Sequence, residues 1–178
     1  MFNVFEGLVK PNSDGDYVCA VASSYEKAED GLTYVFTLRD NVVFHNGQPC
    51  TAEDVLYSFE TCAATSVSSA VVTALSAVTD IRAEGATVTI SLSEANPDFI
   101  SYVASVYIVP KGYDMQTAAP VGTGPFRFVS RSVQENIILE RNESYYGTGA
   151  KLDKVTYKIY EDNNACLLYT SPSPRDKR

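Results

Sequence analysis

Alternation of apolar and polar side chains marks several segments of the chain as strands. Residues 32–39 (LTYVFTLR) and 87–92 (TVTISL) alternate with a period of two and are rich in β-branched and aromatic side chains, a pattern typical of half-buried strands. Residues 136–141 and 154–160 predict further strands in the C-terminal part of the chain. A short strand is also predicted at 42–44, after an Asp-Asn pair that interrupts the first of these segments.

The clearest helix signal covers residues 51–64. It begins with a threonine suited to the N-cap, and the acidic pair at 53–54 is favoured by the helix dipole. Apolar residues then follow at helical spacing. An Asn-Pro pair predicts a short helix over 96–103, whereas residues 65–78 fit no single pattern. Many strands with few helices indicate the α/β class, of the mixed α+β type.

The loop at 119–125 contains Gly122-Thr-Gly124, which superficially resembles a phosphate-binding loop. Pro125 removes a backbone donor, no lysine follows, and a strand rather than a helix comes next. We therefore interpret this loop as a conformationally demanding turn. Pro11–Asp16 also predicts a turn, because its Gly and Asx residues favour turn conformations. Asp14-Gly-Asp16 within it lacks the ligand spacing of a calcium loop.

Residues that carry catalysis or bind metals are scarce. His45 is the only histidine, and we assign it a structural or surface role; neither GxSxG nor HExxH occurs. Cys19, Cys50 and Cys62 have the spacing of neither a disulfide framework nor a metal motif, so they are interpreted as small buried side chains, with a Cys50–Cys62 bridge left open. The sequon at 142–144 matters only in a eukaryotic secretory protein. This scarcity favours a binding module with no catalytic residue, no metal and no cofactor.

Composition and charge narrow the class further. The 178 residues are 45% hydrophobic and 20% charged, as in a soluble globular protein. No apolar run approaches the roughly 18 residues that a membrane span needs. The net charge of -8 comes from 14 Lys and Arg against 22 Asp and Glu, without a basic cluster, and this argues against a nucleic-acid partner.

The last residues do not continue these patterns. Residues 166–176 (CLLYTSPSPRD) resemble the translation of a transposase-type adapter used in shotgun sequencing libraries. A natural Ser/Pro-rich linker is the alternative. We expect 166–178 to be non-native and the chain to be a fragment of a longer protein, so only residues 1–165 enter the fold prediction.

Four blocks, in order along the chain, resemble the family 5 extracellular solute-binding proteins of bacterial ABC importers, the peptide, dipeptide and nickel class. The blocks are Phe5–Val9, residues 30–39 leading into 43–47 and 51–55, residues 120–128, and residues 139–147 leading into 151–155. The resemblance covers nearly all of residues 1–165. Cys50 departs from the aliphatic residue expected at its position.

The resemblance implies a periplasmic-binding-protein-like fold of two lobes hinged around a cleft, of which only the N-terminal lobe portion is present. It assigns residues 1–42 to the first part of lobe I, 43–118 to an inserted subdomain, and 119–165 to the return to lobe I. It also implies that Phe5, Glu6 and Gly7 line the ligand-binding cleft.

The function implied by the resemblance is that of a substrate-binding subunit, which is not an enzyme. It would capture oligopeptides, dipeptides or a nickel-type chelate and deliver them to the permease subunits of an ABC importer. We expect an extracytoplasmic protein, periplasmic or lipid-anchored, that is monomeric at full length, with its signal segment absent from this fragment. The alternatives are a secreted hydrolase or a sensor-type binder whose site lies in a missing C-terminal half.

Overall fold

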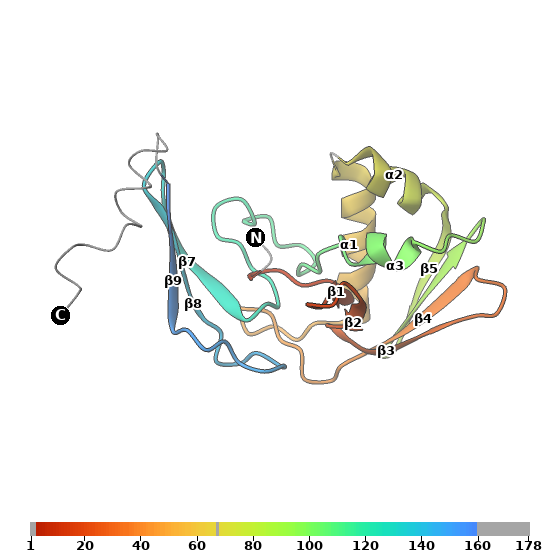
Figure 1. The fold of residues 1–178 in the computed structure, drawn as a ribbon, viewed down its shortest axis with the longest axis horizontal. Coiled ribbons are helices and arrows are strands. Elements are labelled where there is room, and N and C mark those ends of the chain that lie inside the picture. The colour runs from red at the N-terminus through yellow and green to blue at the C-terminus, as the bar shows by residue number, and fades with distance from the viewer. Residues whose placement is uncertain (1–2, 67, 160–178) are drawn as a thin grey trace.

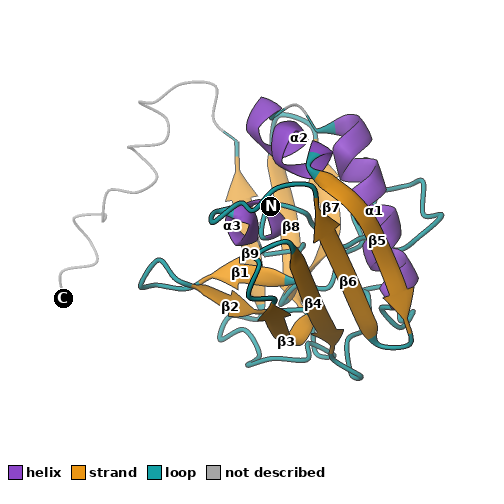
Figure 2. Ribbon diagram, turned by 90° about the vertical axis from the view of Figure 1, so that its right-hand side faces the viewer, coloured by secondary structure: helices purple, strands orange, loops and turns teal. Residues whose placement is uncertain are grey.

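The computed structural model describes residues 3–66 and 68–159, which form three antiparallel sheets and three helices (Figures 1 and 2). The predicted tail at 166–178 lies outside the described residues. In chain order the elements are β1 (Val9–Pro11), β2 (Tyr17–Cys19), β3 (Ala22–Lys27), β4 (Thr33–Leu38), α1 (Ala52–Thr65), α2 (Ser69–Ser76), β5 (Val78–Glu84), β6 (Thr87–Leu92), α3 (Phe99–Val103), β7 (Phe126–Ser132), β8 (Asn136–Arg141) and β9 (Lys154–Lys158).

The larger part of the molecule is a four-stranded sheet with the order β3-β4-β6-β5. Its two central strands bury alternate side chains, Tyr34 and Phe36 on β4 and Val88 and Ile90 on β6, as the period-two pattern requires. The ring of Tyr34 packs against Phe99 of α3, with 5.1 Å between ring centroids. The helices therefore cover the apolar face of this sheet, and the main core lies between them (Figure 2).

Helix α1 is fixed at its N-terminus by one buried carboxylate. Asp54 accepts hydrogen bonds from the backbone N–H of Thr51 at 2.8 Å and from its hydroxyl at 2.7 Å. Its second oxygen accepts the backbone N–H of Lys111 at 2.8 Å. Asp54, three residues after the predicted N-cap Thr51, thus also ties the helix to the segment that follows α3.

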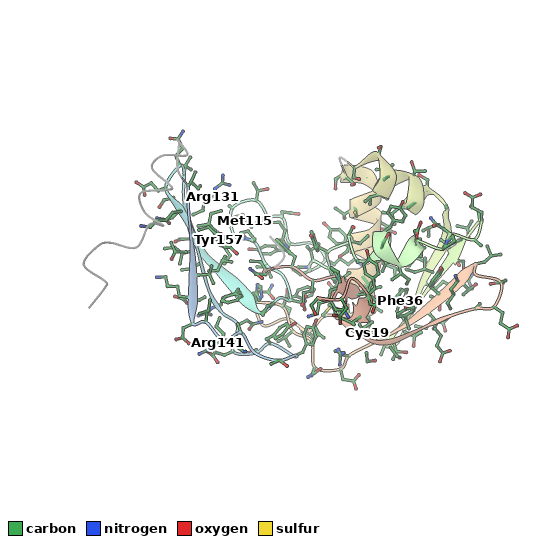
Figure 3. All side chains as sticks on the ribbon, viewed as in Figure 1. Cys19, Phe36, Met115, Arg131, Arg141 and Tyr157 are labelled. Atoms are coloured by element: carbon green, nitrogen blue, oxygen red, sulfur yellow. The ribbon has the colours of Figure 1, made fainter. Side chains whose placement is uncertain are left out.

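A three-stranded sheet with the order β7-β8-β9 forms a second body, at the left of Figure 1. It has a small core of its own, made by Val4, Phe126 and Leu139. Asn3 contacts its edge strand, where the side-chain amide donates to the Tyr157 hydroxyl at 3.0 Å. Tyr157 is labelled on this sheet in Figure 3. Residues from the start of the chain therefore complete this sheet's packing.

The strongest local patterns predicted their elements correctly. Strands β4, β6, β8 and β9 and helices α1 and α3 lie where the sequence predicts them, and the ambiguous stretch 65–78 contains α2. The strand predicted at 42–44 is wrong, because Val43 makes only an isolated bridge to Pro49. The short strands β1 and β2 were missed, and so were β3 and β5. Strands β3 and β5 are the edges of the four-stranded sheet, where exposed polar side chains weaken the alternation.

The three segments 1–42, 43–118 and 119–165, which the resemblance defines, do not each form a separate sheet. The four-stranded sheet takes β3 and β4 from residues 1–42 and β5 and β6 from 43–118, while the three-stranded sheet lies wholly within 119–165. The assignment of these segments to lobes stays a prediction. Among the described residues, no helix has the length and apolar character needed to cross a membrane.

Candidate ligand-binding site

The predicted site residues lie on an extended segment, residues 3–8, that runs between the two bodies (Figure 1). On one side, the backbone N–H of Ile108 donates to the Glu6 carbonyl at 2.9 Å. On the other side, the N–H of Gly124 donates to the Val4 carbonyl at 3.0 Å. Segment 3–8 is thus held by backbone hydrogen bonds from two loops that are distant in sequence.

Glycines allow these loops to approach the segment closely. A Cβ on Gly122 would lie 2.2 Å from the Val4 carbonyl oxygen, and one on Gly124 would lie 2.6 Å from the Asn3 oxygen. A Cβ on Gly7 would lie 2.8 Å from the Val106 oxygen. None of the three has a left-handed φ. The interpretation of Gly122-Thr-Gly124 as a conformationally demanding turn is therefore corrected: the requirement is space beside a backbone.

Phe5 and Glu6 face opposite sides of segment 3–8, as successive residues of an extended chain do. The half-buried ring of Phe5 stacks on Tyr107, with 5.9 Å between centroids and 29° between ring planes. Burial raises the pKa of the Tyr107 hydroxyl, which therefore stays protonated at neutral pH. This pair presents aromatic surface that a ligand can contact.

Glu6 is only 5% exposed, and both oxygens of its carboxylate accept hydrogen bonds inside the protein. One oxygen accepts Lys10 Nζ at 2.7 Å and the Tyr145 hydroxyl at 2.9 Å. The other oxygen accepts the Tyr146 hydroxyl. Lys10 also donates to the Tyr145 hydroxyl at 3.0 Å. We call Glu6, Lys10, Tyr145 and Tyr146 the Glu6 cluster.

The protonation states in the Glu6 cluster follow from burial and from the carboxylate. Burial, and then the negative charge of Glu6, raise the pKa of Tyr146 far above its ordinary value. The pKa of Tyr145 is raised chiefly by burial as well. Burial lowers the pKa of Lys10, but its bonds to Glu6 and Tyr145 outweigh this and leave it raised. Both tyrosines therefore remain protonated donors beside the carboxylate.

His45 holds the glycine loop from its other side. Its Nδ1 accepts the backbone N–H of Gly122 at 3.3 Å, and its Nε2 donates to the Gly124 carbonyl at 3.0 Å. Burial is the main cause that lowers the pKa of His45, and the charge of Arg127 lowers it further, while the bond to Gly124 opposes both. The structural role predicted for His45 is confirmed.

The remaining candidate groups form no reactive site in the described residues. Cys19, Cys50 and Cys62 are free and half-buried, so the Cys50–Cys62 bridge is absent. Burial, and then the charge of Asp54, raise the pKa of Cys50 to about 12. The sequon residue Asn142 is buried and donates to the Gly124 carbonyl at 3.1 Å. Within residues 3–66 and 68–159 no group of three or more His, Cys, Asp and Glu side chains is placed to hold a metal ion.

The structure therefore separates the three predicted ligand-binding residues. Phe5 belongs to a partly exposed aromatic pair, Glu6 is buried and hydrogen-bonded to other side chains, and Gly7 is buried against the Val106 carbonyl. Their ligand role stays a prediction. Sequence reasoning missed Tyr107 and the partners of Glu6. The only signal for the two tyrosines was that they stand, like Glu6, inside the blocks that carry the family resemblance.

Comparison with known proteins identifies the family. Residues 16–169 match the bacterial extracellular solute-binding proteins, family 5. The nickel-binding periplasmic protein of Escherichia coli is 31% identical over 169 residues, which cover 89% of this chain and 32% of that protein. The oligopeptide-binding protein OppA of Bacillus subtilis is 28% identical over an alignment of 190 residues, which covers 92% of this chain and 35% of that protein.

Solved structures agree with the sequence comparisons. NikA of Staphylococcus aureus in complex with Ni(L-His)2 superposes with a TM-score of 0.81 at 30% identity, over 94% of this chain and 36% of that one. DppA of Helicobacter pylori in complex with the peptide STSA gives 0.84 at 27% identity, over 93% and 38%. The chain spans about a third of the length of these relatives. The predicted fold class is confirmed, and the chain belongs to the family 5 bacterial extracellular solute-binding proteins.

Proposed function

We propose that this chain is part of the substrate-binding subunit of a bacterial ABC importer. The subunit captures an oligopeptide, a dipeptide or a nickel chelate and delivers it to permease subunits in the membrane. Its place is extracytoplasmic, either periplasmic or lipid-anchored, and it acts as a monomer that catalyses no reaction. Membership of family 5, whose relatives are named for binding nickel, oligopeptides and dipeptides, is the observation that carries this proposal.

Ligand binding in this proposal uses the side of segment 3–8 that carries Phe5. The aromatic pair of Phe5 and Tyr107 contacts the ligand, and Gly7 allows the segment to pack closely against the Val106 carbonyl, next to Tyr107. Residues 1–42 and 119–165 form parts of lobe I, with the inserted subdomain 43–118 beside it, and the two lobes of the fold close over the ligand by hinge motion. The described residues bring no group of three or more His, Cys, Asp and Glu side chains together, so in this proposal they contact a nickel chelate through its chelator.

The test is a binding measurement on the product of the longest reading frame that contains this chain. Calorimetric titrations would use dialanine, trialanine, the tripeptide Ala-Phe-Ala and the Ni(II) complex of L-histidine as probes. We expect one probe class to bind with a dissociation constant of about 1 µM or below. We also expect the radius of gyration measured by X-ray scattering to decrease in its presence, because closure compacts the two lobes.

Three results would contradict the proposal. Absence of binding by every probe would argue against an importer subunit for peptides or nickel chelates. Cleavage of the peptide probes during a long incubation, detected by mass spectrometry, would favour the hydrolase alternative. Binding without compaction would favour the sensor-type binder, since transport depends on the closed form.

A further inference from the structure

The Glu6 cluster suggests a role beyond that of an ordinary buried ion pair. A carboxylate removed from water is costly unless its oxygens are satisfied by donors. In this chain three donors meet that need, and two of them come from residues 145–146, near the far end of the described chain. A cluster that joins such distant segments fixes the position of the segment that carries the carboxylate.

We propose that Lys10, Tyr145 and Tyr146 are positioning residues for the ligand site, which act through Glu6. They hold the backbone of segment 3–8 so that the ring of Phe5 faces Tyr107 at the proposed ligand-binding surface. This inference rests on the proposed function. It assigns to Glu6 a different role from ligand contact, because both of its carboxylate oxygens are already occupied.

Covalent geometry carries the effect from Glu6 to Phe5. The two residues are consecutive and face opposite sides, so a displacement of the Glu6 side chain moves the peptide unit that carries the Phe5 ring. The Glu6 carbonyl also accepts Ile108 N–H, next to Tyr107. Anchoring Glu6 therefore sets the spacing between the two aromatic rings.

The loop that carries the tyrosines is itself fixed to the opposite side of segment 3–8. The side chain of Asn142 donates to the Gly124 carbonyl at 3.1 Å, and Gly124 N–H donates to the Val4 carbonyl at 3.0 Å. A closed ring of contacts therefore runs from Glu6 through Tyr145 and Tyr146 to the glycine loop and back to segment 3–8. Segment 3–8 is clamped from both faces.

Cationic side chains flank both tyrosine rings. Lys10 Nζ lies 5.8 Å from the centroid of the Tyr145 ring, and the guanidinium of Arg39 lies 5.6 Å from the centroid of the Tyr146 ring. The two rings contact each other with 4.7 Å between centroids. These contacts restrict the tyrosines to the orientation that brings their hydroxyls to Glu6.

The test is Tyr146→Phe, which removes one donor to Glu6 and keeps the ring. Amide hydrogen exchange would be measured at Ile108 and Gly124, which bond to segment 3–8, and at Leu92, which bonds to Leu32 at 2.8 Å in the other sheet. We expect exchange at the first two amides to accelerate about tenfold or more relative to Leu92, since a hydrogen bond to a charged group is lost.

Two control variants separate positioning from general stability. Tyr17→Phe removes a hydroxyl from an exposed ring and should change none of the three exchange rates. Val88→Ala opens a cavity in the buried face of β6 and should accelerate Leu92 at least as much as the other amides. The proposal is overturned if Tyr146→Phe accelerates all three amides equally or leaves them unchanged.

A binding experiment then links the cluster to the ligand. The probe that binds wild type among the four named above is titrated into the Tyr146→Phe and Val88→Ala proteins. We expect about a tenfold weaker affinity for Tyr146→Phe only. Unchanged affinity beside altered exchange would refute the role at the ligand site. If wild type binds no probe, the proposed function fails, and the exchange rates alone decide whether the cluster positions segment 3–8.

Discussion

The close approach of the glycine loop to segment 3–8 predicts that Gly122→Ala is severely destabilising. The added Cβ would lie 2.2 Å from the Val4 carbonyl oxygen and 2.8 Å from Cδ1 of Phe5. An ordinary carbon–oxygen contact is about 3.3 Å, so the loop and the segment must separate by roughly 1 Å. The neighbour that must move is backbone, and it cannot turn aside as a flexible side chain does.

The separation also disrupts hydrogen bonds that hold the segment. Gly124 N–H donates to the Val4 carbonyl at 3.0 Å, and Phe126 N–H donates to the Asn3 carbonyl at 2.9 Å. Overpacking costs about 1–3 kcal/mol, and each backbone hydrogen bond contributes about 1 kcal/mol net. We therefore expect the Gly122→Ala substitution to lower the free energy of unfolding by at least about 3 kcal/mol.

Urea unfolding followed by circular dichroism measures this loss, and Gly149→Ala is the matched control. A Cβ at Gly149 meets no atom within 4 Å, and the φ of this residue is not left-handed, so its free energy of unfolding should change by less than about 0.5 kcal/mol. If Gly122→Ala unfolds at the same urea concentration as Gly149→Ala, the close packing of the loop against segment 3–8 is refuted.

Three further predictions concern titratable groups. Because burial lowers the pKa of His45 from 6.5, the folded state resists its protonation, so the free energy of unfolding should fall as pH drops below 6.5. The His45→Gln protein should lack this component, and the single histidine resonance in NMR spectra should titrate below 6.5 in wild type. Asp54→Ala should lower the free energy of unfolding, measured by urea unfolding, by about 2–4 kcal/mol, because it leaves three donors unpaired. The control is Glu53→Ala, which should cost less than about 1 kcal/mol because the Glu53 side chain is 71% exposed. Because burial raises the pKa of Cys50 to about 12, little of this thiol is the reactive thiolate at pH 7.5. It should react with iodoacetamide roughly a thousandfold more slowly than in the urea-unfolded chain, as measured by peptide mass spectrometry. Equal rates would contradict the burial of this thiol.

The elements that the sequence predicted well are those whose environment is recorded in their own residues. Central strands such as β4 bury every second side chain, so the alternation is visible in the sequence alone. The edge strands β3 and β5 have one neighbour instead of two, carry exposed polar residues and contain an irregularity in their pairing, so the alternation in their sequences is weak. The stretch at 42–44 has the apolar character of a strand but lacks a ladder partner.

The site was less predictable because its contacts join residues far apart along the chain. Glu6 meets a lysine four residues away, which local spacing indicates, but its other donors stand 139 and 140 residues further on. The Gly-Thr-Gly motif was recognised as unusual, yet its purpose depends on a carbonyl of segment 3–8. In the sequence, the only link between Glu6, the glycine loop and the two tyrosines is that all of them lie in blocks that resemble the family.

One local rule bears on the predicted ligand roles of Phe5 and Glu6. In an extended segment neighbouring side chains point to opposite faces, so Phe5 and Glu6 cannot both line one surface. The face of Glu6 is covered by Lys10, Tyr145 and Tyr146, and both oxygens of this buried carboxylate already accept hydrogen bonds from them. In the proposed ligand site, contact is therefore expected on the face of Phe5, and the proposed role of Glu6 is to fix that face in place.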